Sequence, residues 1–246
     1  MAFVAVTGML NEKLALRLMN LGEMTRYGKK LSHADLGEDI LLACVLKPWE
    51  RKDGFYVDAG AHHPSKLSNT KALYDMGWSG INIEANPAAL PVFEKERPRD
   101  INLSCAVTDA DGDSVTLIHV ANQDFGSFAG CNYIEGAPEY PLEEVRRGQV
   151  ATRRLDSIFR EHLKGRKIDV LTMDIEGGEL AALQSNDWMA YRPRIVAVEV
   201  HPFGKAPVDM LESNPVLQFL RSKGYVFFSL TLYTWFFRDG EMPWEY

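Results

Sequence analysis

Cysteine, basic charge and long apolar runs are all scarce in this 246-residue chain. The three cysteines, Cys44, Cys105 and Cys131, are too few and too scattered for a disulfide framework or a zinc knuckle, so a reducing, cytoplasmic location is expected. The net charge of -7 argues against a nucleic-acid binder that works through a broad basic surface. No stretch approaches the roughly 18 consecutive apolar residues that a membrane span needs.

The opening segment Met1–Leu10 also lacks the basic residues that precede the apolar part of a secretory signal. We therefore expect it to begin the folded chain. Hydrophobic residues make up 46% of the sequence and charged residues 25%, which is ordinary globular usage. A chain of this length can form one large domain with a hydrophobic core.

Helical spacing dominates the first 50 residues, where Leu14, Leu18 and Leu21 recur and Glu38–Leu46 forms a second apolar stretch. We expect an N-terminal helical extension over 1–50, which is a candidate surface for homo-oligomer contacts, and a single compact domain over 51–246. In that domain short apolar runs alternate with amphipathic segments, which predicts parallel strands connected by helices. Strands are expected at 55–58, 81–84, 101–107, 115–120, 168–174 and 195–200, and helices at 69–76, 87–97, 155–163, 178–183 and 215–224.

The last two apolar runs, 225–230 and 234–238, are separated only by Thr231-Leu-Tyr233, which is too short for a helical crossover. They must therefore pair antiparallel. The predicted fold class is α/β, with a seven-stranded, mostly parallel sheet and a C-terminal antiparallel hairpin, the Rossmann-like layout of class I methyltransferases. The glycine- and proline-rich segment 121–150 breaks the rhythm, and we expect a loop insertion there that serves as a lid or a binding loop.

Acidic residues and a glycine mark the ends of the first two strands predicted in this domain. Asp58 and Gly60 close the first strand, and Glu84 closes the second. Ligands of such sheets bind beyond the carboxyl ends of the strands, and an acid after the second strand accepts hydrogen bonds from ribose hydroxyls. The glycine motifs of dinucleotide and phosphate loops are absent, and Asp58 would repel a pyrophosphate. The pattern favours the cation S-adenosylmethionine; a turn glycine and a solvated glutamate are the alternative.

Five motifs in order make the chain resemble the FkbM-type methyltransferases. They are Val57-Asp-Ala-Gly-Ala-His-His-Pro64, Leu67-Ser-Asn-Thr70, Gly77-Trp-Ser-Gly-Ile-Asn-Ile-Glu-Ala-Asn-Pro87, Asp174-Ile-Glu-Gly-Gly-Glu179 and Val198-Glu-Val-His-Pro202. The segment Ser32–Asp39 resembles the one that precedes the domain in one branch of the family. The resemblance implies S-adenosylmethionine-dependent O-methylation, often of sugars or natural-product scaffolds. The expected cofactor contacts are Asp58, Gly60, Ala61, His62, Ser68, Asn69, Glu84, Ala85, Asn86, Ala106 and Asp174.

The run His62-His63-Pro64 departs from the general methyltransferase pattern, in which a second glycine commonly stands in this loop. Neighbouring side chains point apart, so two histidine ligands for one metal ion is the least favoured interpretation. A structural turn fixed by Pro64 is the simplest one. A role for one histidine over the cofactor or the substrate is the third.

Two later strand ends supply the candidate catalytic residues Asp174, Glu199 and His201. Their strands are neighbours in the expected sheet, about 4.8 Å apart, so the two carboxylates can converge. A hydroxyl becomes a good nucleophile when a base or a metal removes its proton. His201 could be that base, or Asp174 and Glu199 could hold Mg²⁺ or Mn²⁺, the version that we favour. Alternatively, Asp174 caps a turn and Glu199 pairs with an arginine. Glu176 and Glu179 are expected only to complement a helix N-terminus.

The acidic loop Asp109-Ala-Asp-Gly-Asp113 allows another interpretation, a sugar-nucleotide transferase, although a polar turn between strands explains the loop more simply. The arginine pairs at 146–147 and 153–154 are expected to form a solvated basic face, with an anionic substrate as the alternative. The predicted function is S-adenosylmethionine-dependent O-methyl transfer to a hydroxyl of a carbohydrate or a glycosylated metabolite, with no nucleic-acid partner. A non-catalytic α/β binding scaffold is the remaining alternative.

Overall fold

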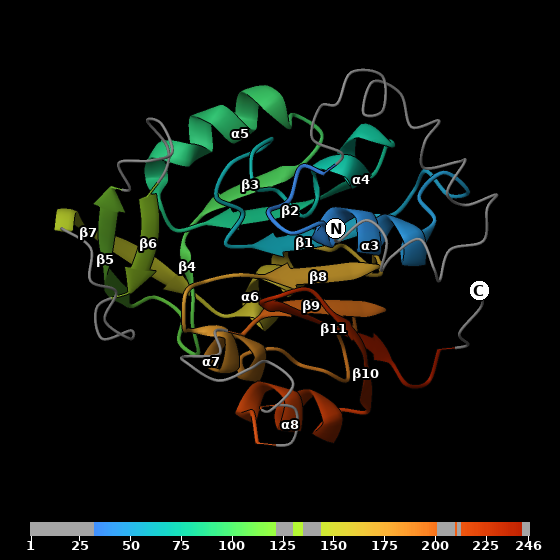
Figure 1. The fold of residues 1–246 in the computed structure, drawn as a ribbon. Coiled ribbons are helices and arrows are strands. Elements are labelled where there is room, and N and C mark those ends of the chain that lie inside the picture. Colours follow the sequence, from blue (N-terminus) through green and yellow to red (C-terminus); the bar gives the residue numbers. More distant parts are fainter. Residues whose placement is uncertain (1–31, 122–129, 135–143, 201–209, 211–212, 243–246) are drawn as a thin grey trace.

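A computed structural model describes residues 32–121, 130–134, 144–200, 210 and 213–242. Its centre is a seven-stranded sheet with the order β10-β11-β9-β8-β1-β2-β3 (Figure 1). Neighbouring strands from β3 across to β9 are parallel, and β11 is antiparallel to both β9 and β10, which confirms the predicted fold class. The strands are β1 (Phe55–Ala59), β2 (Ser79–Glu84), β3 (Ile101–Ser104), β8 (Val170–Met173), β9 (Ile195–Glu199), β10 (Tyr225–Leu230) and β11 (Thr234–Asp239).

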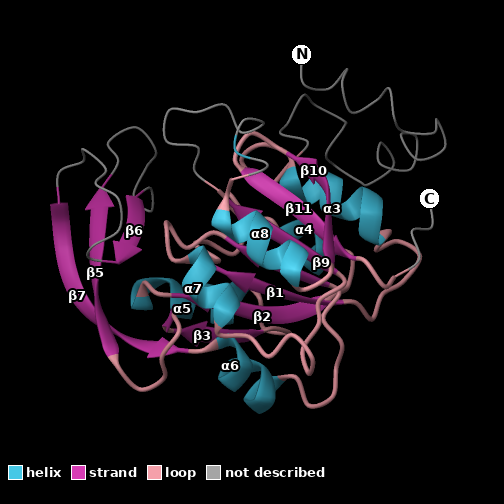
Figure 2. Cartoon of the chain, turned by 90° about the horizontal axis from the view of Figure 1, so that it is seen from below, coloured by secondary structure: helices cyan, strands magenta, loops and turns pink. Residues whose placement is uncertain are grey.

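Helices cover both faces of this sheet, and Figure 2 shows α6 on one side of β1 and β2 with α3 and α4 on the other. On one face Leu42, Leu46 and Leu73 pack against the strand residues Val170 and Phe236. The larger core on the opposite face includes apolar residues of α6, α7 and α8. Every residue of β1 and β8 is buried, as expected for parallel strands covered on both faces. The helices are α3 (Glu38–Leu46), α4 (Lys71–Asp75), η2 (Pro87–Ala89), α5 (Leu90–Glu96), α6 (Leu155–His162), α7 (Glu179–Gln184) and α8 (Pro215–Ser222).

A second sheet, with four strands in the order β4-β7-β5-β6, lies beside the main sheet (Figure 1). The expectation of a loop insertion over 121–150 is therefore wrong for 130–134 and 144–150, which pair antiparallel with β5. Polar β7 shows no apolar run, which is why sequence patterning missed it. Residues 122–129 and 135–143 lie outside the described residues, so the role as a lid stays a prediction. The strands are β4 (Ala106–Val107), β5 (Ser114–Ala121), β6 (Gly130–Ile134) and β7 (Glu144–Arg153).

The described part of the N-terminal extension is tied to the main domain. Helix α3 has the predicted bounds, and residues 1–31 lie outside the described residues, so the rest of the extension stays a prediction. Glu38 accepts a hydrogen bond from the Thr231 hydroxyl of the β10–β11 turn (2.7 Å), and the His33 carbonyl accepts one from the Ser68 N–H (3.0 Å). Within the residues placed by the structure, no helix has the length and apolar character needed to cross a membrane.

Candidate active site

Gly60 follows β1 at the edge of the sheet where the carboxyl ends of β1, β2, β8 and β9 meet. Its φ of 81° is left-handed, and its N–H donates to the Ile83 carbonyl at 2.9 Å. A Cβ atom at this position would lie 1.6 Å from the carbonyl oxygen of Asp174. Only glycine therefore lets the loop after β1 pass so close to the end of β8.

Asp58 is a buried acid next to this loop. Its Oδ2 atom accepts a hydrogen bond from the Thr70 hydroxyl at 2.6 Å. Burial raises the pKa of Asp58 to about 6, against the opposing effects of the Thr70 hydrogen bond and the nearby Arg97 guanidinium. A carboxylate in such surroundings attracts a cationic ligand more strongly than a solvated one, because the local dielectric constant is low.

Glu84 ends β2 with a carboxylate that backbone groups hold in place. Its Oε2 atom accepts the N–H of His62 (2.8 Å), and its Oε1 atom accepts the N–H of Asn86 (2.7 Å). Glu84 is only 7% exposed, which excludes a solvated glutamate, and burial raises its pKa. Because a carboxylate has about four acceptor positions, these N–H groups leave acceptor capacity for ribose hydroxyls.

The structure explains the departure at His62-His63-Pro64. His62 has a φ of 52°, a conformation that glycine favours, and this turn points its N–H at Glu84. His63 is buried, and its Nδ1 atom accepts the N–H groups of Ser65 (3.1 Å) and Lys66 (3.3 Å). Burial also lowers the pKa of His63, which favours the neutral ring that accepts these bonds. These contacts support the interpretation as a structural turn.

The other residues expected to contact a cofactor line the same edge. Asn69 donates from Nδ2 to the Thr172 hydroxyl on β8 (3.0 Å), which fastens the loop to the sheet. The Ser68 hydroxyl is buried and accepts a hydrogen bond from Arg97 (2.9 Å). The Asn86 side chain accepts the N–H of Ala88 in η2 (3.0 Å). Ala61, Ala85 and Ala106 belong to small apolar clusters around the ends of β1 and β2 and on β4.

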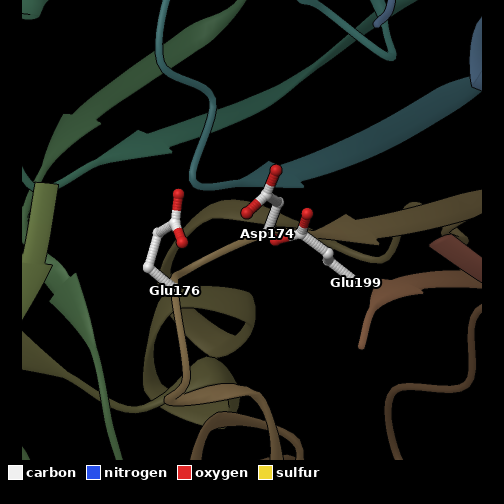
Figure 3. A group of neighbouring side chains, drawn as sticks. All are labelled: Asp174, Glu176 and Glu199. Carbon is white, nitrogen blue, oxygen red and sulfur yellow. The ribbon is translucent and has the colours of Figure 1, made fainter. Parts of the chain in front are cut away.

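Asp174, Glu176 and Glu199 point toward one another at the ends of β8 and β9, and we call them the acid group (Figure 3). One carboxylate oxygen of each lies within 4.8 Å of the others. Met173 pairs with Val198. The residues that follow them, Asp174 and Glu199, are therefore also neighbours, as predicted. Asp174 Oδ1 is buried and has no hydrogen-bond partner among the described residues. Burial and the adjacent Glu199 raise the pKa of Asp174.

Glu176 was expected only to complement a helix N-terminus, yet the structure brings it into the acid group. Its φ of 59° marks a sharp turn after β8 that the sequence pattern did not reveal. Glu179 lies in the first turn of α7, as expected, and its Oε1 atom also accepts the N–H groups of Ile175 (3.1 Å) and Gly177 (3.0 Å) in the turn that precedes the helix. His201 lies outside the described residues, so its role stays a prediction.

Residues 109–113 form a turn that is held by the start of α6. The Asp111 carboxylate accepts the backbone N–H of Arg154 (2.8 Å) and the hydroxyl of Ser157. Among the described residues, only the acid group brings three possible metal ligands close enough together to hold an ion. Residues 109–113 do not form such a group. The second basic pair is engaged in ion pairs, Arg153 with Glu161 and Arg154 with Asp156.

Sheet order, glycine loop and strand-end acids together define the class of protein. The order β3-β2-β1-β8-β9-β11-β10, with β11 antiparallel, is that of the class I methyltransferase fold, with Asp58, Gly60 and Glu84 at the ligand-binding edge. The family model for the methyltransferase FkbM domain matches residues 58–227. The chain therefore belongs to the FkbM methyltransferase family, and it is an S-adenosylmethionine-dependent methyltransferase.

Solved methyltransferase structures are similar to this chain at low sequence identity. The TehB-like SAM-dependent methyltransferase from Corynebacterium glutamicum is 12% identical, with 93% of this chain and 97% of that chain covered and a TM-score of 0.42. Aeropyrum pernix fibrillarin in complex with natively bound S-adenosyl-L-methionine is 10% identical, with 83% and 73% covered and a TM-score of 0.45. No curated protein matches the chain. The family match therefore carries the assignment.

Proposed function

We propose that the protein transfers a methyl group from S-adenosylmethionine to a hydroxyl of a carbohydrate or a glycosylated natural product. In this proposal Glu84 binds the ribose hydroxyls and Asp58 attracts the cationic methionine end. The residues fit this cofactor, because Glu84 keeps acceptor capacity beside the N–H groups of His62 and Asn86, and Asp58 is a buried acid. The bound cofactor supplies a methyl group on a sulfonium. The resemblance to FkbM-type enzymes supports the class of acceptor.

The observation that carries the chemistry is the acid group, which lies beside the loop that follows β1 at Gly60. An alkyl hydroxyl attacks poorly until its proton is removed. Without a bound cation, the raised pKa of Asp174 makes its ionised carboxylate a stronger proton acceptor than an ordinary one. We place the acceptor hydroxyl at Asp174 Oδ1, the buried oxygen that has no hydrogen-bond partner among the described residues.

A divalent cation fits the same acid group, and metal assistance is the version that we favour. Asp174, Glu176 and Glu199 would be the ligands, since their oxygens lie within 4.8 Å of one another. Opposite oxygens lie up to about 5 Å apart around larger divalent ions, which can therefore reach all three oxygens, and about 4.2 Å apart around Mg²⁺, which would draw the carboxylates closer together. When bound, such an ion lowers the pKa of a hydroxyl. It also offsets the repulsion between neighbouring carboxylates.

His201 is the alternative base, because an unperturbed pKa of about 6.5 leaves much of the imidazole neutral at pH 7. The experiment is a methyl-transfer assay with S-adenosylmethionine and a panel of glycans and glycosylated metabolites, with and without EDTA. We expect transfer to a sugar hydroxyl, loss of activity in EDTA, recovery with Mg²⁺ or Mn²⁺, and a kcat at least about 100-fold lower in Asp174→Asn. Activity that persists in EDTA and in Asp174→Asn defeats the metal version. Activity that also survives His201→Ala defeats the whole cluster.

Sugar transfer from a nucleotide at residues 109–113 has less support, because Asp111 is bonded to the start of α6. We also propose a cytoplasmic location and a homo-oligomer formed through the N-terminal helices, whose residues 1–31 lie outside the described residues. Light scattering of the full chain tests the second point, and a monomeric mass contradicts it.

A further inference from the structure

Arg97 is a fully buried arginine at the C-terminal end of α5 that the proposed chemistry does not use. Its Nε atom donates to the carbonyl of Pro64 (2.9 Å). Its two terminal nitrogens donate to the hydroxyls of Ser68 (2.9 Å) and Thr70 (3.2 Å). All three acceptors belong to the loop between β1 and α4, which we call the cofactor loop (residues 60–70).

The same guanidinium is anchored to the sheet on its other side. It donates to the Tyr56 hydroxyl on β1 (3.0 Å) and lies 3.7 Å from the Asp100 carboxylate. Asp100 is itself fixed by the Gly80 N–H (2.9 Å) and the Asn82 amide (2.9 Å) of β2. Because a guanidinium is a rigid planar group, Arg97 fixes the cofactor loop relative to β1 and β2.

The cofactor loop has a conformation that needs such support. His62 and Leu67 are non-glycine residues with a φ of 52°, and such positions persist only where surrounding contacts hold them. The loop in turn places the groups that orient two acids. The His62 N–H bonds Glu84, and the Thr70 hydroxyl bonds Asp58.

Charge connects Arg97 to the same acids. The groups that act on Asp58 are the Thr70 hydroxyl, the Arg97 cation and the Asp100 carboxylate, and Asp58 acts on Glu84. Of these groups Arg97 carries the positive charge, and it opposes the effect of burial on the pKa of Asp58. Removal of that charge makes Asp58 take up a proton at a higher pH.

We infer that Arg97 is a positioning residue for S-adenosylmethionine: it holds the cofactor loop in the geometry that binds the cofactor and does not touch the cofactor itself. The inference rests on the cofactor site proposed above. It predicts that Arg97 variants lose affinity for the cofactor through the loop and through the charge, and these two effects can be separated.

The test is calorimetric titration of the full chain with S-adenosylhomocysteine at pH values on both sides of about 6, with thermal unfolding in parallel. We expect Arg97→Gln to weaken binding at least about tenfold, because bonds from a charged group are lost, and to move the pH midpoint of binding upward. Arg97→Lys keeps the charge, but an ammonium group cannot reproduce the guanidinium fork. We therefore expect it to weaken binding while the pH midpoint stays at the wild-type value.

Arg192→Gln is the matched control, because Arg192 makes a two-bond ion pair with Asp239 (2.7 Å each) at the far edge of the sheet. It should lower the unfolding temperature and leave both affinity and pH midpoint unchanged. Wild-type affinity in both Arg97 variants, while Glu84→Ala weakens binding, overturns the inference and leaves the cofactor site standing. If the wild-type protein does not bind S-adenosylhomocysteine, both the inference about Arg97 and the proposed cofactor site are overturned. Where Arg97→Gln does not fold, wild-type affinity in Arg97→Lys is enough to overturn the inference.

Discussion

Replacement of Glu84 by alanine removes the acceptor that we expect to bind both ribose hydroxyls of S-adenosylmethionine. In the wild type the carboxylate is fixed before the ligand arrives, because His62 and Asn86 donate to it at 2.8 and 2.7 Å. Hydrogen bonds to a charged group contribute about 1.5–3 kcal/mol each, and water replaces part of this in the variant. We therefore expect binding to weaken by about 1–3 kcal/mol, which is a factor of roughly 5–150 in Kd.

The same substitution has a separate effect on folding. It leaves two backbone N–H groups without their acceptor, at a cost of about 1–3 kcal/mol each where they stay buried. It also removes a carboxylate whose pKa burial raises, which offsets part of that cost. Glu84→Gln is the control, because its amide oxygen keeps one acceptor, and its affinity should lie between those of the wild type and Glu84→Ala.

The assay is isothermal titration with S-adenosylhomocysteine, and thermal unfolding of the same samples shows that each variant is folded. The ligand carries the same ribose as the cofactor, so it reports the interaction directly. A folded Glu84→Ala protein that binds with wild-type affinity removes Glu84 from the cofactor site and refutes the reasoning.

Three further predictions concern the same edge of the sheet. His62→Gly keeps the left-handed turn and the N–H, so affinity for S-adenosylhomocysteine should stay within about threefold of wild type, and a larger loss would assign a role to the imidazole. Affinity should rise with pH through about 6, because the ligand's ammonium group binds the ionised form of Asp58, and equal affinities below and above that pH contradict this. Without ligand the sign is opposite: the raised pKa makes the folded protein hold more protons than the unfolded chain between about pH 4 and pH 6, so this group lowers stability as pH rises through that window. Asp174→Asn removes one of the adjacent acids, so it should raise the unfolding temperature of the ligand-free protein while it lowers the kcat of transfer at least about 100-fold. A lower unfolding temperature contradicts repulsion within the acid group.

Burial made most of the main sheet predictable from the sequence. Parallel strands covered on both faces read as continuous apolar runs, and β1 begins at the predicted residue 55 and ends one residue later than predicted, at Ala59. Outside the parallel part of the sheet, α3 and β10 also have the predicted bounds, Glu38–Leu46 and Tyr225–Leu230. The second sheet was not predictable in the same way. Its strand β7 is polar, and the glycines and prolines around it read as turns. Antiparallel pairing with β5 decides its structure, and such pairing leaves little trace in a polar sequence.

The residues of the site also separate into those that the sequence predicts and those that it does not. Asp58, Glu84 and the proximity of Asp174 to Glu199 follow from strand ends and strand order, which the sequence pattern predicts. Arg97 does not follow, because it ends the predicted helix 87–97, where a basic residue usually complements the helix dipole. Only the fold brings Pro64, 33 positions earlier in the chain, within 2.9 Å of its guanidinium.

Calorimetric titration of the wild-type chain with S-adenosylhomocysteine, and separately with a nucleotide sugar, tests most directly whether this edge of the sheet is an S-adenosylmethionine site. We predict a single class of sites for S-adenosylhomocysteine and no binding of the nucleotide sugar. Binding of the nucleotide sugar alone contradicts the account and favours a transferase that uses residues 109–113. Absence of binding for both ligands contradicts an S-adenosylmethionine site at this edge.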